Sequence, residues 1–137
     1  MKIKTIKLQE HLKHASRDQL DQIMTDIHSR TFVEELEHLR HDKKISKSTL
    51  LSKTLLDKNY GYQILQGTRQ PSKDKVLQLS LALGCNLEDT NRLLTLSDNP
   101  VLYSKDKKDA LFIYALSNQL TVMETNELIY SYGYELT

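Results

Sequence analysis

The sequence predicts an all-α fold, on three observations. The 137 residues include only four glycines and two prolines, whereas sandwiches and barrels of strands use many such turn residues. Apolar residues recur at the three- and four-residue spacing of amphipathic helices. Cap residues precede several of these stretches, and Thr31 with Glu34 and Thr121 with Glu124 match the capping-box pattern. The length corresponds to one domain with a core of its own.

The first predicted helix lies in an N-terminal helical arm, residues 1–30. Ser16 is placed to cap this helix, because a hydroxyl before the first turn accepts a hydrogen bond from a free backbone amide. The apolar face of the helix consists of Leu20, Ile23, Met24 and Ile27. The arm is one candidate for a dimerising element.

Five further helices are predicted in the central segment, residues 31–98. The first of them follows the Thr31 capping box and buries Phe32, Leu36 and Leu39. The other four are expected over residues 47–54, 58–66, 73–83 and 87–96. Their starts are marked by the cap residues Ser46, Asp57, Ser72 and Asn86. Two of these helices are expected to end at glycines, Gly67 and Gly84, as is common at helix C-termini.

A helical hairpin is predicted in the C-terminal segment, residues 99–137. Its helices are expected over 105–118 and 122–132, and Gly133 is placed to end the second. The run 111–116 is apolar nearly all round, which indicates a helix buried on two sides. The sequence leaves open whether the hairpin packs on its own domain or dimerises.

The second half of the chain contains an internal echo. Residues 73–94 align with residues 108–129 at a constant offset of 35. The pair Lys73-Asp74 matches Lys108-Asp109, and Thr90-Asn91 matches Thr125-Asn126. Two copies are too few for a solenoid. We interpret the echo as one helical-hairpin plan used twice.

The charge is unevenly distributed along the chain. The net charge of +1 hides a basic segment, residues 43–75, with eight Lys/Arg against two Asp/Glu. The flanking segments 1–42 and 76–137 carry net charges of −1 and −4. A local basic surface of this kind is what phosphate binding requires.

The basic segment also carries a recognisable motif. A short capped helix, a tight turn and a second short helix ending at Gly67 are followed by Gly-x-Arg-x-Pro and a further helix. Over residues 32–97 this resembles the Cro/C1 (lambda-repressor-like, XRE) helix-turn-helix family. The runs Tyr60-Gly61-Tyr62-Gln63-Ile64 and Glu124-Thr125-Asn126-Glu127-Leu128 resemble a group of small helix-turn-helix proteins from Gram-positive bacteria.

The resemblance implies a lambda-repressor-like bundle that reads DNA with the second helix of the motif. The implied base-contacting residues are Lys58, Asn59, Tyr62 and Gln63. The implied phosphate-contacting residues are Ser46, Lys47, Ser48, Tyr60, Thr68, Arg69, Lys73 and Lys75. Tyr60 is equally suited to packing at a helix end, and Arg69 to holding the loop through its carbonyls.

Three positions depart from the usual motif. Leu51 stands where Ala is usual in the first helix, and Gly61 stands where a β-branched residue is usual in the second. These two changes are expected to conserve volume where the helices cross. Leu55 replaces the usual turn glycine, and a left-handed conformation there would cost about 1 kcal/mol or more.

Several functions are excluded by what the sequence lacks. No nucleophile–base–orienter set and no glycine-rich phosphate loop is visible, so we expect no enzyme and no cofactor. The pairs His11/His14 and His38/His41 lack further ligands for a metal site. The single cysteine, Cys85, favours a reducing cytoplasm. No apolar run is long enough to suggest a membrane helix, and no small-molecule ligand is evident.

The sequence therefore predicts a cytoplasmic bacterial transcription regulator. It is expected to bind double-stranded DNA sequence-specifically through its helix-turn-helix, as a homodimer on a pseudo-palindrome. The alternative is a helical protein–protein interaction module, such as an antitoxin or adaptor, that retains the same fold. The operator and the direction of regulation do not follow from the sequence.

Overall fold

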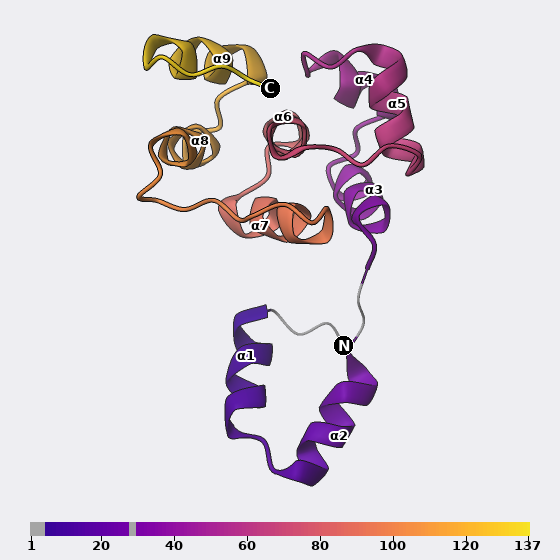
Figure 1. Ribbon diagram of the computed structural model, residues 1–137. Coiled ribbons are helices and arrows are strands. Elements are labelled where there is room, and N and C mark those ends of the chain that lie inside the picture. The colour runs from indigo at the N-terminus through magenta and orange to yellow at the C-terminus, as the bar shows by residue number, and fades with distance from the viewer. Residues whose placement is uncertain (1–4, 28–29) are drawn as a thin grey trace.

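Nine α-helices and no strand make up the part of the chain that the structure describes, residues 5–27 and 30–137 of a computed structural model (Figure 1). The all-α prediction is therefore confirmed. The helices are α1 (Thr5–His14), α2 (Arg17–Asp26), α3 (Phe32–Asp42), α4 (Lys47–Ser52), α5 (Lys58–Gln66), α6 (Lys73–Leu83), α7 (Leu87–Leu96), α8 (Lys107–Ser117) and α9 (Val122–Ser131).

The predicted caps explain where most helices begin. Capping boxes form at Ser16, Thr31 and Thr121, each with a glutamine or glutamate three residues later. The bounds of α5, α6 and α7 agree with the prediction. One helix, α1, was missed, because the sequence pattern around its start was not assigned a cap residue. The described residues of the N-terminal arm thus form two helices where the sequence predicted one.

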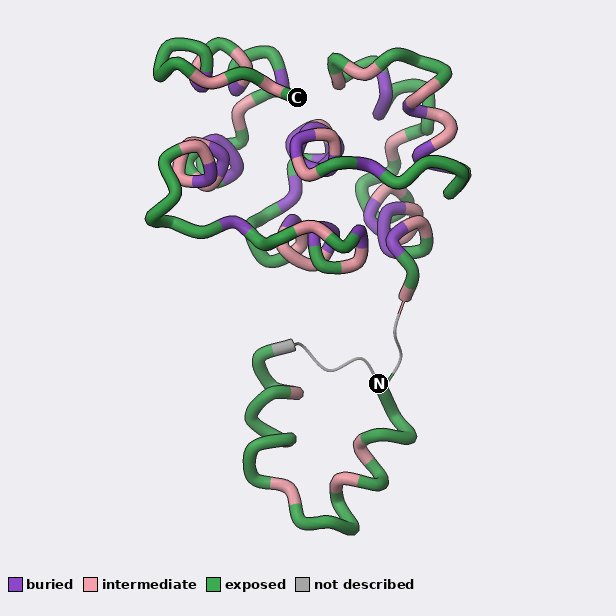
Figure 2. Tube along the Cα trace, in the orientation of Figure 1, coloured by how far each residue is buried: buried purple, intermediate pink, exposed green. Residues whose placement is uncertain are grey.

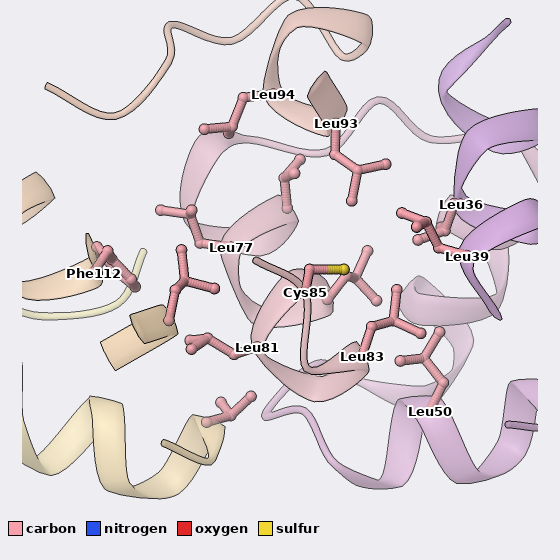
Figure 3. Packing of buried hydrophobic residues seen from close by; sticks show 14 of the residues in the cluster. Leu36, Leu39, Leu50, Leu77, Leu81, Leu83, Cys85, Leu93, Leu94 and Phe112 are labelled. Carbon is pink, nitrogen blue, oxygen red and sulfur yellow. The ribbon is translucent and has the colours of Figure 1, made fainter. Parts of the chain in front are cut away.

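Within the group α3 to α9, helix α6 lies at the centre, between α4, α7, α8 and α9 (Figure 1). It is buried on all sides because its apolar residues do not form a single stripe. Its buried hydrophobic residues are Val76, Leu77, Leu79, Leu81 and Leu83. Figure 3 shows several of them between Leu36 and Leu39 of α3 and Phe112 of α8.

The C-terminal hairpin packs on its own domain, which is one of the two arrangements that the sequence left open. Phe112 and Ala115 of α8 and Ile129 of α9 are completely buried in the common core. Helix α8 lies against α6 and α7, and α9 lies against α6. Helices α3 to α9 therefore share one core, and we call them the seven-helix body.

The internal echo has a structural counterpart at the starts of α6 and α8. Lys73 Nζ donates to Asp109 Oδ2 at 3.0 Å, and Lys108 Nζ donates to Asp74 Oδ2 at 2.7 Å. Matching residues of the two copies thus pair crosswise. Both carboxylates are buried, and in each case the lysine ammonium group offsets the negative charge.

A third buried carboxylate joins α3 to α7. Glu35 is 1% exposed. Its Oε2 accepts from Arg30 at 3.0 Å, and its Oε1 accepts from Arg92 of α7 at 3.4 Å. Two guanidinium groups therefore compensate the buried charge and hold the start of α3 in place.

The turn between α4 and α5 differs from the expectation. Leu55 is absent from the positive-φ positions of the described residues, so its expected left-handed strain is wrong. The non-glycine residues with positive φ are Lys44, Asp98 and Gln119. They follow the ends of α3, α7 and α8, where the chain must turn away from each helix.

Candidate nucleic-acid interface

Gly61 of α5 lies against Leu51 of α4 where the two helices pack together. A Cβ placed on Gly61 would lie 2.6 Å from Leu51 Cδ2, so the Leu51 side chain would have to shift to admit it. Leu51 therefore occupies the volume that a side chain at position 61 would take, as the sequence indicated. Both residues are buried, and their contact sets how closely α5 approaches α4.

The α4–α5 turn is fastened to α6 by a side chain that the sequence analysis did not single out. The backbone N–H of Leu55 donates to Gln78 Oε1 at 2.8 Å, and Gln78 is buried. The signal for it in the sequence is a polar residue within the apolar run of α6. This bond keeps the start of α5 at a fixed place on the body.

The base-contacting candidates occupy the first two turns of α5. Asp57 caps the helix, because its Oδ2 accepts from the backbone N–H of Tyr60 at 3.2 Å. Lys58 and Asn59 are exposed, and Tyr62 and Gln63 are half-buried. The first two side chains are thus open to a ligand, and the other two present only part of their surface.

Gln63 is held by Arg69, a contact between two of the predicted residues. Arg69 Nε donates to Gln63 Oε1 at 2.9 Å. The Arg69 guanidinium also lies 5.5 Å from the centre of the Tyr60 ring. Arg69 therefore orients a side-chain amide instead of the loop carbonyls. The Nε2 group of Gln63 remains a donor.

The phosphate-contacting candidates near α4 and after α5 are only partly free. The Ser46 hydroxyl accepts from the backbone N–H of Thr49 at 3.1 Å and donates to Thr49 Oγ1 at 2.9 Å, so the cap uses it. Lys47 and Ser48 are exposed in the first turn of α4. The Thr68 hydroxyl donates to the Gln63 carbonyl at 3.2 Å and closes the end of α5.

Lys73 and Lys75 lie toward the C-terminal part of the chain. Lys73 pairs with Asp109, as described above. Lys75 Nζ donates to the main-chain oxygen of Thr137 at 2.8 Å and lies 5.5 Å from the Tyr60 ring centre. Tyr60 itself is half-buried and packs against the core. These three residues thus serve contacts within the molecule.

Three other lysines gather where the sequence analysis assigned no role. Lys43, Lys44 and Lys53 line a hollow of about 470 Å³ together with Ser46 and Thr49. These three lysines are part of the basic segment. That they lie close together depends on the left-handed turn at Lys44, with φ of 53°. The hollow lies next to the start of α4.

The turn before α4 is held by an arginine of α3. Arg40 Nη1 donates to the carbonyl of Ile45 at 2.9 Å, and Arg40 Nη2 pairs with Glu37 at 2.6 Å. The hydrogen bond from Arg40 lowers the pKa of Glu37, and the charge of Lys47 contributes in the same direction. Glu37 therefore stays ionised and partly offsets the positive charge at this end of α4.

The thiol of Cys85 is buried and so is shielded from solvent. Burial raises the pKa of Cys85 to about 12, and the charge of Asp89 acts in the same direction. The thiol therefore stays protonated and is a poor nucleophile. Over residues 5–27 and 30–137, no three metal-ligating side chains come together, and no helix has the length and apolar character to cross a membrane.

Comparisons of the chain with protein-family models, with curated proteins and with solved structures found no match.

Proposed function

We propose that the protein is a sequence-specific DNA-binding regulator of the lambda-repressor-like helix-turn-helix class, with α3 to α7 as its DNA-binding domain. The observation that carries the proposal is the start of α5. There a capped helix presents exposed Lys58 and Asn59 next to the amide of Gln63, which Arg69 orients. The surrounding segment 43–75 carries a net charge of +6, which supports binding to a polyanion.

In this proposal, α5 enters the major groove with its first two turns against the base edges. Asn59 and Gln63 match the donor and acceptor pattern of adenine, and Lys58 can donate to guanine. The hydrogen bond from Arg69 fixes the Gln63 amide before binding. Less rotamer entropy is therefore lost when Gln63 binds the base. Tyr62 offers a partly exposed ring beside them.

Phosphate contacts would flank this helix. Lys47 and Ser48 face one strand and Thr68 and Arg69 the other, while the hollow of Lys43, Lys44 and Lys53 adds positive charge. The proposed phosphate contacts do not include Lys73 and Lys75, because these lysines bind Asp109 and the main-chain oxygen of Thr137.

Selection of bound fragments from random DNA, followed by affinity measurements, tests the proposal. Gln63→Ala is expected to lose about 1–3 kcal/mol of discrimination at one base pair. Lys47→Ala should weaken binding to all sequences alike and reduce the salt slope by about 0.9. Lys105→Ala, an exposed cation outside the proposed face, is the matched control and should change neither. A selection without a preferred sequence would contradict the proposal.

A second candidate function rests on a different surface. Several aromatic and apolar side chains of the C-terminal segment are exposed, which is the composition of many protein-binding surfaces. They are Tyr103, Tyr114, Met123, Tyr130 and Tyr132. If the protein is instead an interaction module, Tyr130→Ser with Tyr132→Ser abolishes its activity in the cell, and Gln63→Ala leaves that activity intact.

A further inference from the structure

The last residues of the chain lie beside the start of α5. After α9 the chain continues without helix through residues 134–137, which we call the C-terminal tail. A hollow of about 580 Å³ is lined by Leu136 and Thr137 of the tail and by Asp57 and Tyr60 at the start of α5. Figure 2 shows the tail as exposed and intermediate residues, whereas α6, on which it lies, is largely buried.

The tail is fastened to two neighbouring residues of α6. The backbone N–H and the hydroxyl of Thr137 donate to Asp74 Oδ2 at 2.8 and 3.0 Å. The main-chain oxygen of Thr137 accepts from Lys75 Nζ at 2.8 Å. Leu136 adds a partly buried apolar contact with the core. One tail residue therefore occupies the ammonium group of Lys75.

This attachment can be released without leaving a buried charge unpaired. Asp74 keeps its ion pair with Lys108 Nζ at 2.7 Å when the tail leaves. The partner of Lys75 is a neutral oxygen of an exposed residue, which water can replace. Lys73 differs, because it pairs with the buried carboxylate of Asp109, and breaking that pair would leave a buried charge uncompensated. Of these two lysines, Lys75 is thus the one that can be freed.

Lys75 lies next to the proposed DNA-binding face. Its Nζ is 5.5 Å from the centre of the Tyr60 ring, and the Arg69 guanidinium lies at the same distance from that ring. Tyr60 directly follows Lys58 and Asn59 in the first turn of α5. Once released from the tail, Lys75 would be a free cation beside the helix that we assign to the major groove, where it can meet a phosphate.

We infer that the C-terminal tail is an autoinhibitory contact, which keeps Lys75 from a DNA phosphate until the tail is released. The inference rests on the proposed DNA binding. Because the tail is part of the same chain, it competes for the ammonium group at a high effective concentration. Release of the tail adds one phosphate contact to the face formed by α4 and α5.

DNA affinity measured over a series of salt concentrations tests the inference. The tail variant is Leu136→Ser with Thr137→Pro, which removes the apolar contact and both donors to Asp74 without changing the net charge. It is expected to bind a random-sequence duplex more tightly than the wild type, and the slope of log affinity against log salt should steepen by about 0.9. Glu135→Asp, at an exposed tail position, is the matched control and should behave as the wild type.

Lys75→Met identifies the cation that the tail releases. Methionine keeps an unbranched apolar side chain beside Tyr60 and removes the charge. In the tail variant this change should abolish the gain in affinity and in slope, whereas with the wild-type tail it should have little effect. Circular dichroism melting checks that the seven-helix body is intact. Thr137→Pro alone should give the same gain, and it replaces the double variant if that variant melts early.

The outcomes separate this inference from the proposed function. If the wild type binds DNA and the tail variants bind it no more tightly, the inference alone is overturned. An effect of Lys75→Met that is equal with and without the tail contact would overturn it in the same way. If the wild type binds no DNA at any salt concentration, the proposed function fails and the inference fails with it.

Discussion

At the residue scale, the packing of α4 against α5 depends on the exchange of volume between Leu51 and Gly61. We expect Gly61→Ala to destabilise the protein by about 1–3 kcal/mol, because the added methyl group would lie 2.6 Å from Leu51 Cδ2. Leu51→Ala alone should cost about 2–5 kcal/mol through the cavity that it leaves. Urea unfolding measures both changes.

The double variant is the decisive comparison. If the two positions share one volume, Leu51→Ala combined with Gly61→Ala costs clearly less than the sum of the single changes. Additive costs would mean that the two residues do not limit the approach of the helices.

Gln119 gives a second prediction at this scale. It follows α8 with φ of 52°, a conformation that costs a non-glycine residue about 1 kcal/mol. We expect Gln119→Gly to raise the free energy of unfolding by up to about 1 kcal/mol. Gln119→Ala is the control and should not stabilise. Thermal unfolding of both variants provides the measurement.

At the element scale, the crossed ion pairs fix the C-terminal hairpin to α6, and one of them makes stability depend on pH. Burial raises the pKa of Asp74, but hydrogen bonds from Lys108 and from the backbone N–H and hydroxyl of Thr137 outweigh this effect, and the pKa is lowered overall. A lowered folded-state pKa stabilises the fold above the ordinary value of about 3.9, and this contribution is lost as the pH falls through the folded pKa.

Asp74→Asn should therefore cost about 1.5–3 kcal/mol at neutral pH. The difference from the wild type should shrink as the pH falls below about 4. Glu135→Gln, at an exposed carboxylate, is the control and should change little. Unfolding curves at several pH values test this expectation, and a difference that is constant with pH would contradict it.

The elements themselves could largely be predicted, because their signals are local. A cap such as Asp57 and a left-handed terminator such as Gly67 act within one turn of their own helix. The contacts between elements could not be predicted in this way. Lys73 was expected on DNA but pairs with Asp109, 36 residues away in the chain. The Gln78 bond to the α4–α5 turn likewise requires the position of α6 in space.

The candidate site was predictable in part for the same reason. Lys58 and Asn59 follow directly from the position of the α5 cap, and both are exposed. The link from Arg69 to Gln63 joins residues separated by a turn whose path the sequence does not specify. The hollow of Lys43, Lys44 and Lys53 depends on how α3, α4 and α6 meet.

At the scale of the whole molecule, the cations of the basic segment fall into two groups. Lys73 and Lys75 hold the C-terminal part of the chain to α6. Those around α4 and α5 are exposed and form the face that we assign to DNA.

The most direct test of this assignment is an NMR titration of the labelled full chain with a selected DNA duplex at low salt. Amide resonances of residues 47–48, 58–63 and 68–69 are expected to shift, and the shifts should disappear as salt is raised, because phosphate contacts release counterions. Shifts confined to α8 and α9, or no shifts at any salt concentration, would contradict the claim that α5 reads DNA.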